Sequence, residues 1–165
     1  MTVKVDLSKF SRAMAKVLED VSSPASMREI GDEAADRIRT RTRLGKGVDE
    51  RGGDPFPLKA LSPGYKEFRK KKKAGPGKLS QFTSPGKSNL TFTGQLLDSI
   101  RVISQGAASV VIALYGGRKG GGTNKEVGGY VSEARPFLNL SKAELNGLAR
   151  TIRQRIDASL KRFLT

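Results

Sequence analysis

The middle of this chain is too rich in glycine and proline to form long helices or strands. Glycine and proline recur throughout residues 44–88, where glycine adds backbone freedom and proline removes a hydrogen-bond donor. This spacing leaves room for a turn or two of helix, which we expect at residues 63–73, where Tyr65 and Phe68 lie three residues apart. We therefore predict two ordered ends and, between them, a long basic arm that depends on a partner for its order.

Before the arm, the sequence has the spacing of two amphipathic helices. Apolar residues recur at intervals of three and four along residues 7–21, and again along residues 27–38. Ser26 and Glu29 have the spacing of a capping box, which predicts the start of the second helix. Charge alternates with Ile or Thr over residues 37–43, a pattern typical of a strand or of a frayed helix end. We favour the helix end, because cations near a helix C-terminus complement its dipole.

Two further helices are predicted after the arm. Thr93 is placed to cap a short helix at residues 95–99. Ser141 and Glu144 repeat the capping-box spacing ahead of a long apolar stripe, which predicts a C-terminal helix. The stripe consists of Leu145, Leu148, Ile152, Ile156, Leu160 and Phe163.

The region between these helices favours β-structure. Val and Ile dominate a stretch near residues 99–115 that is interrupted by Gln105, Gly106 and Ala107, as expected for a β-hairpin. The second strand is apolar on both faces, which predicts a place inside the sheet. A flexible Gly-rich loop at 116–129 and a third strand near 130–138 would follow. The predicted class is α+β, with this small antiparallel sheet flanked by the helices in one domain over residues 1–165.

The absence of cysteine and histidine excludes most common enzyme designs. Disulfides, thiolate or imidazole metal sites, and nucleophiles activated by histidine are all ruled out. The acidic cluster of Asp49, Glu50 and Asp54 could bind a divalent cation, as a metal-dependent nuclease would require. Arg51 lies among these carboxylates and the pattern of a calcium loop is missing, so we favour a solvated turn.

A nucleotide site is not favoured either. Gly86, Lys87 and Ser88 resemble the end of a phosphate-binding loop, but Gln81 stands where the first glycine of that motif belongs. We therefore expect a protein that is not an enzyme and that uses no cofactor and no metal.

The net charge of +15 and the pI near 10.4 favour an anionic partner. Nucleic acid, anionic lipid and an acidic protein surface all remain open. The sequence lacks an apolar stretch long enough to span a membrane and lacks the apolar core of a signal peptide, so we expect a soluble, intracellular product. The arm carries the densest positive charge, which could contact phosphates without reading bases, enter an acidic groove, or be solvated. These residues are Lys66, Arg69, Lys70, Lys71, Lys72, Lys73 and Lys78.

Two separated motifs resemble a known group of proteins. The first lies in residues 89–100 and the second at the start of residues 135–141, before the C-terminal helix. Together they resemble the tail-completion and virion-morphogenesis proteins of tailed bacteriophages, including the Mu-like morphogenesis and head–tail joining families, over roughly residues 28–160. The motif residues are Leu90, Thr93, Gly94, Leu96, Ser99, Ile100, Arg135, Pro136, Phe137 and Leu138.

The resemblance implies a structural role in the virion. Such a chain would be made in the host cytoplasm and would form a homo-oligomeric ring, six-fold or twelve-fold, at the head–tail junction or the upper tail end. Its partners would be portal, head–tail adaptor, tail tube or terminator proteins, with a contact to packaged DNA as a further option. The competing hypothesis is a nucleic-acid-binding protein that uses the lysine-rich arm. For residues 135–138 we favour packing over an exposed recognition motif.

Overall fold

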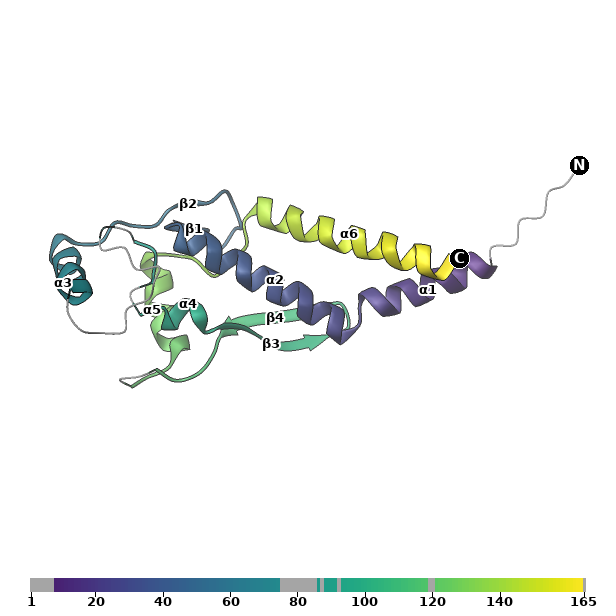
Figure 1. The fold of residues 1–165 in the computed structure, drawn as a ribbon, viewed down its shortest axis with the longest axis horizontal. Helices are drawn as coiled ribbons and strands as arrows, with labels where there is room; N and C mark the ends of the chain where they lie inside the picture. Colours follow the sequence, from purple (N-terminus) through teal and green to yellow (C-terminus); the bar gives the residue numbers. More distant parts are fainter. Residues whose placement is uncertain (1–7, 75–85, 87, 92, 119–120, 165) are drawn as a thin grey trace, which may run out of the picture.

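The structure, a computed structural model, describes residues 8–74, 86, 88–91, 93–118 and 121–164. Within these residues it contains six helices and two antiparallel sheets of two strands each, so the predicted α+β class is confirmed (Figure 1). The helices are α1 (Ser8–Val21), α2 (Pro24–Arg43), α3 (Pro63–Ala74), α4 (Gln95–Asp98), α5 (Asn124–Ala134) and α6 (Lys142–Leu164). The strands are β1 (Lys46–Gly47), β2 (Phe56–Pro57), β3 (Ile100–Gly106) and β4 (Ser109–Leu114).

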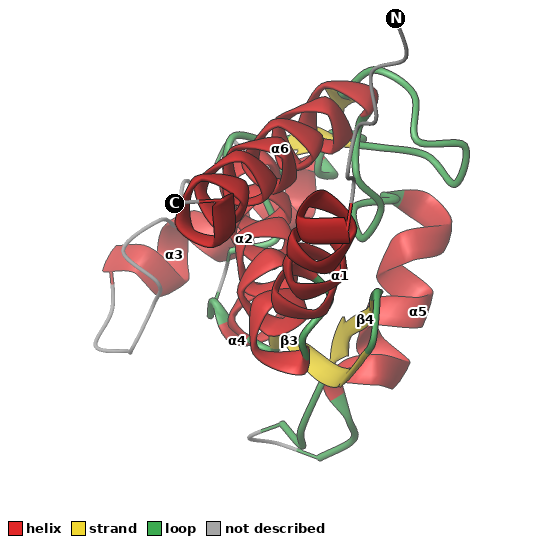
Figure 2. Cartoon of the chain, turned by 90° about the vertical axis from the view of Figure 1, so that its right-hand side faces the viewer, coloured by secondary structure: helices red, strands yellow, loops and turns green. Residues whose placement is uncertain are grey.

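Helix α2 is the central element of the fold. It lies between α6 on one side and the β3–β4 hairpin on the other, as Figures 1 and 2 both show. Gly31 allows the close approach to the hairpin, because a Cβ atom there would lie 2.5 Å from Val110 Cγ2 and 2.6 Å from Val102 Cγ2. The predicted apolar stripe of α2 is buried, and the helix continues to Arg43, which confirms the helix end.

The start of α2 differs from the prediction. Ser23 is the N-cap, and its hydroxyl accepts a hydrogen bond from the Ser26 amide at 3.2 Å. Pro24 occupies the first helical turn, where its missing N–H costs nothing. The predicted capping box at Ser26 and Glu29 is therefore wrong, because both residues already lie inside the helix.

The hairpin near residues 99–115 is confirmed, but its place in the sheet is not. Ile100 pairs with Leu114 and Gly106 pairs with Ser109, with a bulge after Val102. Among the described residues this sheet has only β3 and β4, so β4 lies at an edge, and the prediction of an interior strand is wrong.

The predicted third strand is also wrong, because residues 124–134 form α5. Thr123 and Glu126 form a capping box that starts this helix, where the sequence suggested a loop at 116–129. Gly128 is buried and faces β4 and α4: a Cβ atom there would lie 1.9 Å from Leu114 Cδ1. Val127 and Val131 pack against the core from the same helix, at the four-residue spacing that one helical face provides.

Part of the predicted arm is ordered and contributes to the core. Val48, Leu58 and Leu61 are buried, and the amide of Leu58 donates to the Gly45 carbonyl at 2.8 Å. The short helix expected at residues 63–73 is present as α3. Part of residues 44–88, predicted as an arm that depends on a partner for its order, therefore has buried contacts within the chain itself.

The two chain-terminal helices pack on each other at one end of the molecule (Figure 1). The Asp20 carboxylate of α1 accepts hydrogen bonds from Ser159 Oγ at 2.5 Å and from the Arg162 guanidinium at 2.7 Å. The Ser159 hydrogen bond, followed by the charge of Arg162, lowers the pKa of Asp20.

None of the described helices has the length and apolarity needed to cross a membrane.

Two adjacent glycines of α5 allow a matched test of the packing of this helix on the hairpin. We expect Gly128→Ala to destabilise the protein by about 1–3 kcal/mol, because the new methyl group overlaps Leu114. Gly129→Ala is the control: nothing lies within 4 Å of its Cβ position, so the better helix propensity of Ala should stabilise by about 0.5–1 kcal/mol. Urea unfolding measures both, and equal effects of the two changes would contradict this packing.

The contact between α1 and α6 predicts a dependence of stability on pH. The folded-state pKa of Asp20 lies below the unfolded value of about 3.9, so its contribution is present above pH 4 and is lost as pH falls through the folded-state pKa. Asp20→Asn should therefore be less stable than the unchanged protein at pH 6, with a smaller gap at pH 3. Urea midpoints at the two pH values measure the gap; Asp157→Asn, on an exposed position of α6, is the charge-matched control. A gap for Asp20→Asn that is constant with pH would contradict this interpretation.

Candidate functional site

The residues of the first motif build the core. Leu96 and Ile100 belong to the main buried cluster, and the Ser99 hydroxyl donates to the Leu96 carbonyl at 2.7 Å. Gly94 is the N-cap of α4 with φ of 79°, a left-handed conformation that favours glycine. Thr93 makes no capping hydrogen bond, so the prediction that it caps this helix is wrong.

The second motif joins the ordered part of the arm to the core. Arg135 Nε donates to the Lys59 carbonyl at 3.1 Å and to Ser88 Oγ at 3.0 Å. The Pro136 carbonyl accepts from the Val48 amide at 3.1 Å, and Phe137 is fully buried. Packing is therefore the role of Phe137, whereas Leu138, expected beside it in the core, is 36% exposed. The Ser88 hydroxyl is engaged in this structural contact.

A buried ion pair that sequence reasoning missed holds the second motif in place. Arg41 of α2 forms an ion pair with Glu144, and both side chains are largely buried. Its Nη2 also donates to the carbonyls of Phe137 at 2.6 Å and of Asn139 at 2.8 Å. Burial lowers the pKa of Arg41, while the charge of Glu144 acts in the opposite direction. The sequence did contain a signal for the burial of Arg41: it follows Ile38 by three residues and so lies on the apolar stripe of α2.

Glu144 also starts the C-terminal helix, as its spacing from Ser141 predicted. The Ser141 amide donates to Glu144 Oε2 at 2.7 Å, and the Glu144 amide donates to Ser141 Oγ at 3.2 Å. The predicted capping box of α6 is therefore confirmed, and one carboxylate serves both the cap and the pair with Arg41.

The predicted basic residues of the arm do not share one surface. Lys70, Lys71 and Lys72 are exposed on α3, but Arg69 is only 2% exposed and lines a pocket. Arg69 therefore lies apart from the exposed lysines with which the sequence grouped it. The Lys66 side chain is half-buried. The side chain of Lys73 and the whole of Lys78 lie outside the described residues.

The exposed side of α3 combines rings with charge. The rings of Tyr65 and Phe68 are stacked, with centroids 6.0 Å apart, and the ammonium group of Lys72 lies 6.0 Å from the centroid of Phe68. Lys70 pairs with Glu67 at 2.8 Å, and the hydrogen bond from Lys70 lowers the pKa of Glu67. This surface could contact phosphates or an acidic protein.

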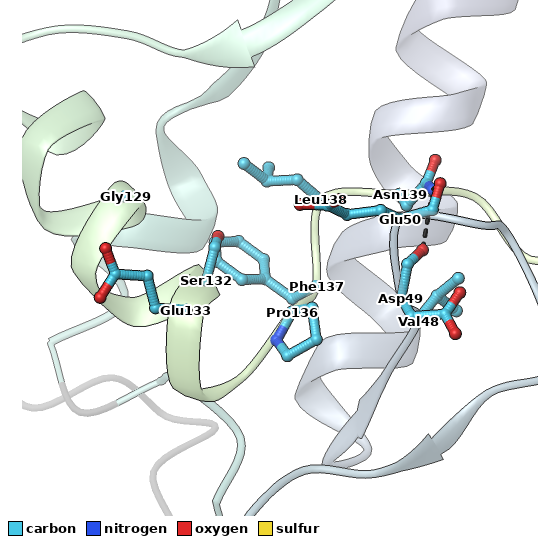
Figure 3. A pocket seen from close by; sticks show the side chains of 10 residues that line it. All are labelled: Val48, Asp49, Glu50, Gly129, Ser132, Glu133, Pro136, Phe137, Leu138 and Asn139. Atoms are coloured by element: carbon cyan, nitrogen blue, oxygen red, sulfur yellow. Dashed lines mark hydrogen bonds between the residues drawn. The ribbon is translucent and has the colours of Figure 1, made fainter.

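An acidic hollow of about 550 Å³ lies between α5 and the loop after β1. Glu133 lines it from α5, and Asp49 and Glu50 line it from the loop; all three are labelled in Figure 3. Its floor includes Phe137, and the Asn139 amide group fixes the loop by donating to the carbonyls of Asp49 and Glu50, each at 2.8 Å. The described residues of its lining include no basic side chain, so this hollow suits a positively charged group.

The acidic cluster predicted as a solvated turn, Asp49, Glu50 and Asp54, contains the side-chain-to-backbone hydrogen bonds of a turn. Asp49 Oδ1 accepts from the amides of Arg51 at 3.0 Å and Gly53 at 3.5 Å. Within the described residues no group of three carboxylate, thiol or imidazole side chains could hold a metal ion.

A second pocket of about 280 Å³ has the opposite charge. Arg69 of α3, Arg118 of the loop before α5 and Arg135 all line it, and the part of its lining that the structure describes holds no carboxylate. Leu61, Leu90, Leu96, Val127 and Val131 supply its apolar walls. From the sequence, Arg69 was grouped with the lysines of the arm, and Arg118 lies in the stretch predicted as a Gly-rich loop.

Nothing matches this chain among protein-family models, curated proteins or solved structures.

The buried ion pair provides a test of how the motif is held. We expect Arg41→Met to destabilise the protein by about 3–5 kcal/mol, because it leaves Glu144 and two carbonyls without their cation. Arg155→Met is the matched control, since Arg155 also joins α6 to α2, but its partner Glu29 is exposed. This control should cost no more than about 1 kcal/mol in urea unfolding. Similar losses for the two variants would contradict the assigned role of Arg41.

Proposed function

We propose that this chain is a structural virion protein of a tailed phage, which assembles into a ring at the head–tail junction or the upper tail end. It acts by binding neighbouring proteins and not by catalysis. Its partners are further copies of the same chain, in a six-fold or twelve-fold ring, and the portal, adaptor or tail tube proteins above and below. The resemblance carried by residues 89–100 and 135–138 supports the class of protein.

The observation that carries the assembly proposal is the uncovered hairpin. One face packs on α2 through Val102 and Val110, but Ile103 and Val111 are each 49% exposed on the hairpin. A sheet of two strands has two edges with unpaired backbone groups, and it gains stability when a further element covers it. A second copy of the chain can supply that cover.

The distribution of charge supports the same proposal. A ring requires that one face of each subunit match a different face of the next. The acidic hollow around Asp49, Glu50 and Glu133 and the exposed lysines of α3 are surfaces of opposite charge on one chain. Such surfaces favour head-to-tail contacts between copies.

A second candidate function is sequence-independent binding of nucleic acid. Lys70, Lys71 and Lys72 are exposed on one helix beside the stacked rings of Tyr65 and Phe68. Lysines neutralise phosphates and aromatic rings stack on unpaired bases, so this helix suits single-stranded nucleic acid or a duplex backbone.

The ring proposal predicts that the hairpin face is needed for assembly. The purified full chain should form a closed oligomer of defined mass in native mass spectrometry and rings in electron micrographs. Val111→Glu should convert it to a monomer, because the ring would bury the new carboxylate between two copies of the chain. The thermal unfolding of the subunit should not change.

Leu145→Glu is the matched control, since Leu145 on α6 has the same exposed fraction as Val111. It should assemble as the unchanged chain does. A chain that stays monomeric at all concentrations and binds duplex DNA with a steep salt dependence would favour the second function instead. An oligomer that tolerates Val111→Glu would remove the hairpin from the interface.

A further inference from the structure

The three arginines of the second pocket converge from separate parts of the chain. Arg69 belongs to α3, Arg118 lies in the loop before α5, and Arg135 is the C-cap residue of α5. Guanidinium groups repel one another, and a pocket lined by three of them has a strongly positive potential. Among the described residues that line it there is no Asp or Glu to reduce that potential.

Neutral groups hold two of these arginines in position. Arg118 Nη1 donates to Asn124 Oδ1 at 3.0 Å, and the Asn124 amide group in turn donates to the carbonyls of Tyr115 at 3.1 Å and Gly116 at 3.2 Å. Arg135 is oriented by the Lys59 and Ala60 carbonyls and by Ser88. These acceptors fix the geometry but carry no formal charge, so the positive charge of the pocket is retained.

The third arginine is the buried one. Arg69 is 2% exposed, and burial lowers its pKa, while the nearby Tyr65 acts in the opposite direction. Arg69 lines the same pocket as Arg118 and Arg135, so its guanidinium adds to the positive potential there.

We propose that this pocket binds a single oxyanion group, a phosphate or a carboxylate, between Arg69, Arg118 and Arg135. Arginine presents planar pairs of N–H donors that match the oxygens of both groups. The volume of about 280 Å³ suits a small anion or one side-chain-sized group, and the apolar walls suit a short aliphatic stem. The backbone of duplex DNA is too broad for a recess of this size. This inference stands independently of ring formation.

Titration of the full chain with inorganic phosphate tests the pocket. NMR chemical shifts of backbone amides and arginine Nε–H groups should change with saturation, at an ionic strength held constant with sodium chloride. A parallel titration with acetate identifies which oxyanion the pocket prefers. Arg118→Gln should weaken binding about tenfold, because it removes one charged hydrogen-bonding partner from a half-exposed position.

Arg101→Gln is the matched control, since it removes the same charge from an exposed position on the hairpin. It should leave the dissociation constant unchanged, and Arg118→Lys should bind with intermediate strength because it retains the charge without the planar donor pair. Circular dichroism confirms the fold of each variant. Shifts that do not saturate with either anion, or equal weakening by Arg118→Gln and Arg101→Gln, would overturn the proposal.

Discussion

The ion pair between Arg41 and Glu144 connects α2, the segment before α6 and the start of α6. One guanidinium reaches from α2 to the backbone at Phe137 and Asn139, and the carboxylate that balances its charge also caps α6. Burying this cation would be costly without these partners, so the segment between α5 and α6 has little freedom to move. The position of Phe137 in the core follows from this constraint.

The same segment also organises the surface. The Pro136 carbonyl and the Asn139 side chain hold β1 and the loop that follows it, which places Asp49 and Glu50 at the rim of the acidic hollow. Arg135, one residue earlier, is bound to the chain leading into α3 and lines the arginine pocket. Both hollows are therefore lined by residues of this one segment, Arg135 in the arginine pocket and residues 136–139 in the acidic hollow.

The proposed surfaces differ in the free energy that they offer a partner. The hairpin face offers apolar area, which stabilises an interface without much specificity. The acidic hollow and the lysines of α3 offer complementary charge, which selects orientation and speeds encounter more than it adds affinity. The arginine pocket is recessed and fits one small group. A ring subunit can use the first two together, because each copy meets its neighbours through different faces.

The sequence alone determined the helices that carry long apolar stripes, the hairpin near residues 99–115 and the capping box at Ser141, because these depend on local periodicity and local hydrogen bonds. It did not determine α5, because its glycines predicted a loop. Only the structure shows that Gly128 is needed for the close packing of this helix on Leu114. The sequence also could not reveal that Arg41 and Arg69 are buried, since burial of a charge depends on partners distant in the chain. Only the tertiary structure brought those partners together, and with them both hollows.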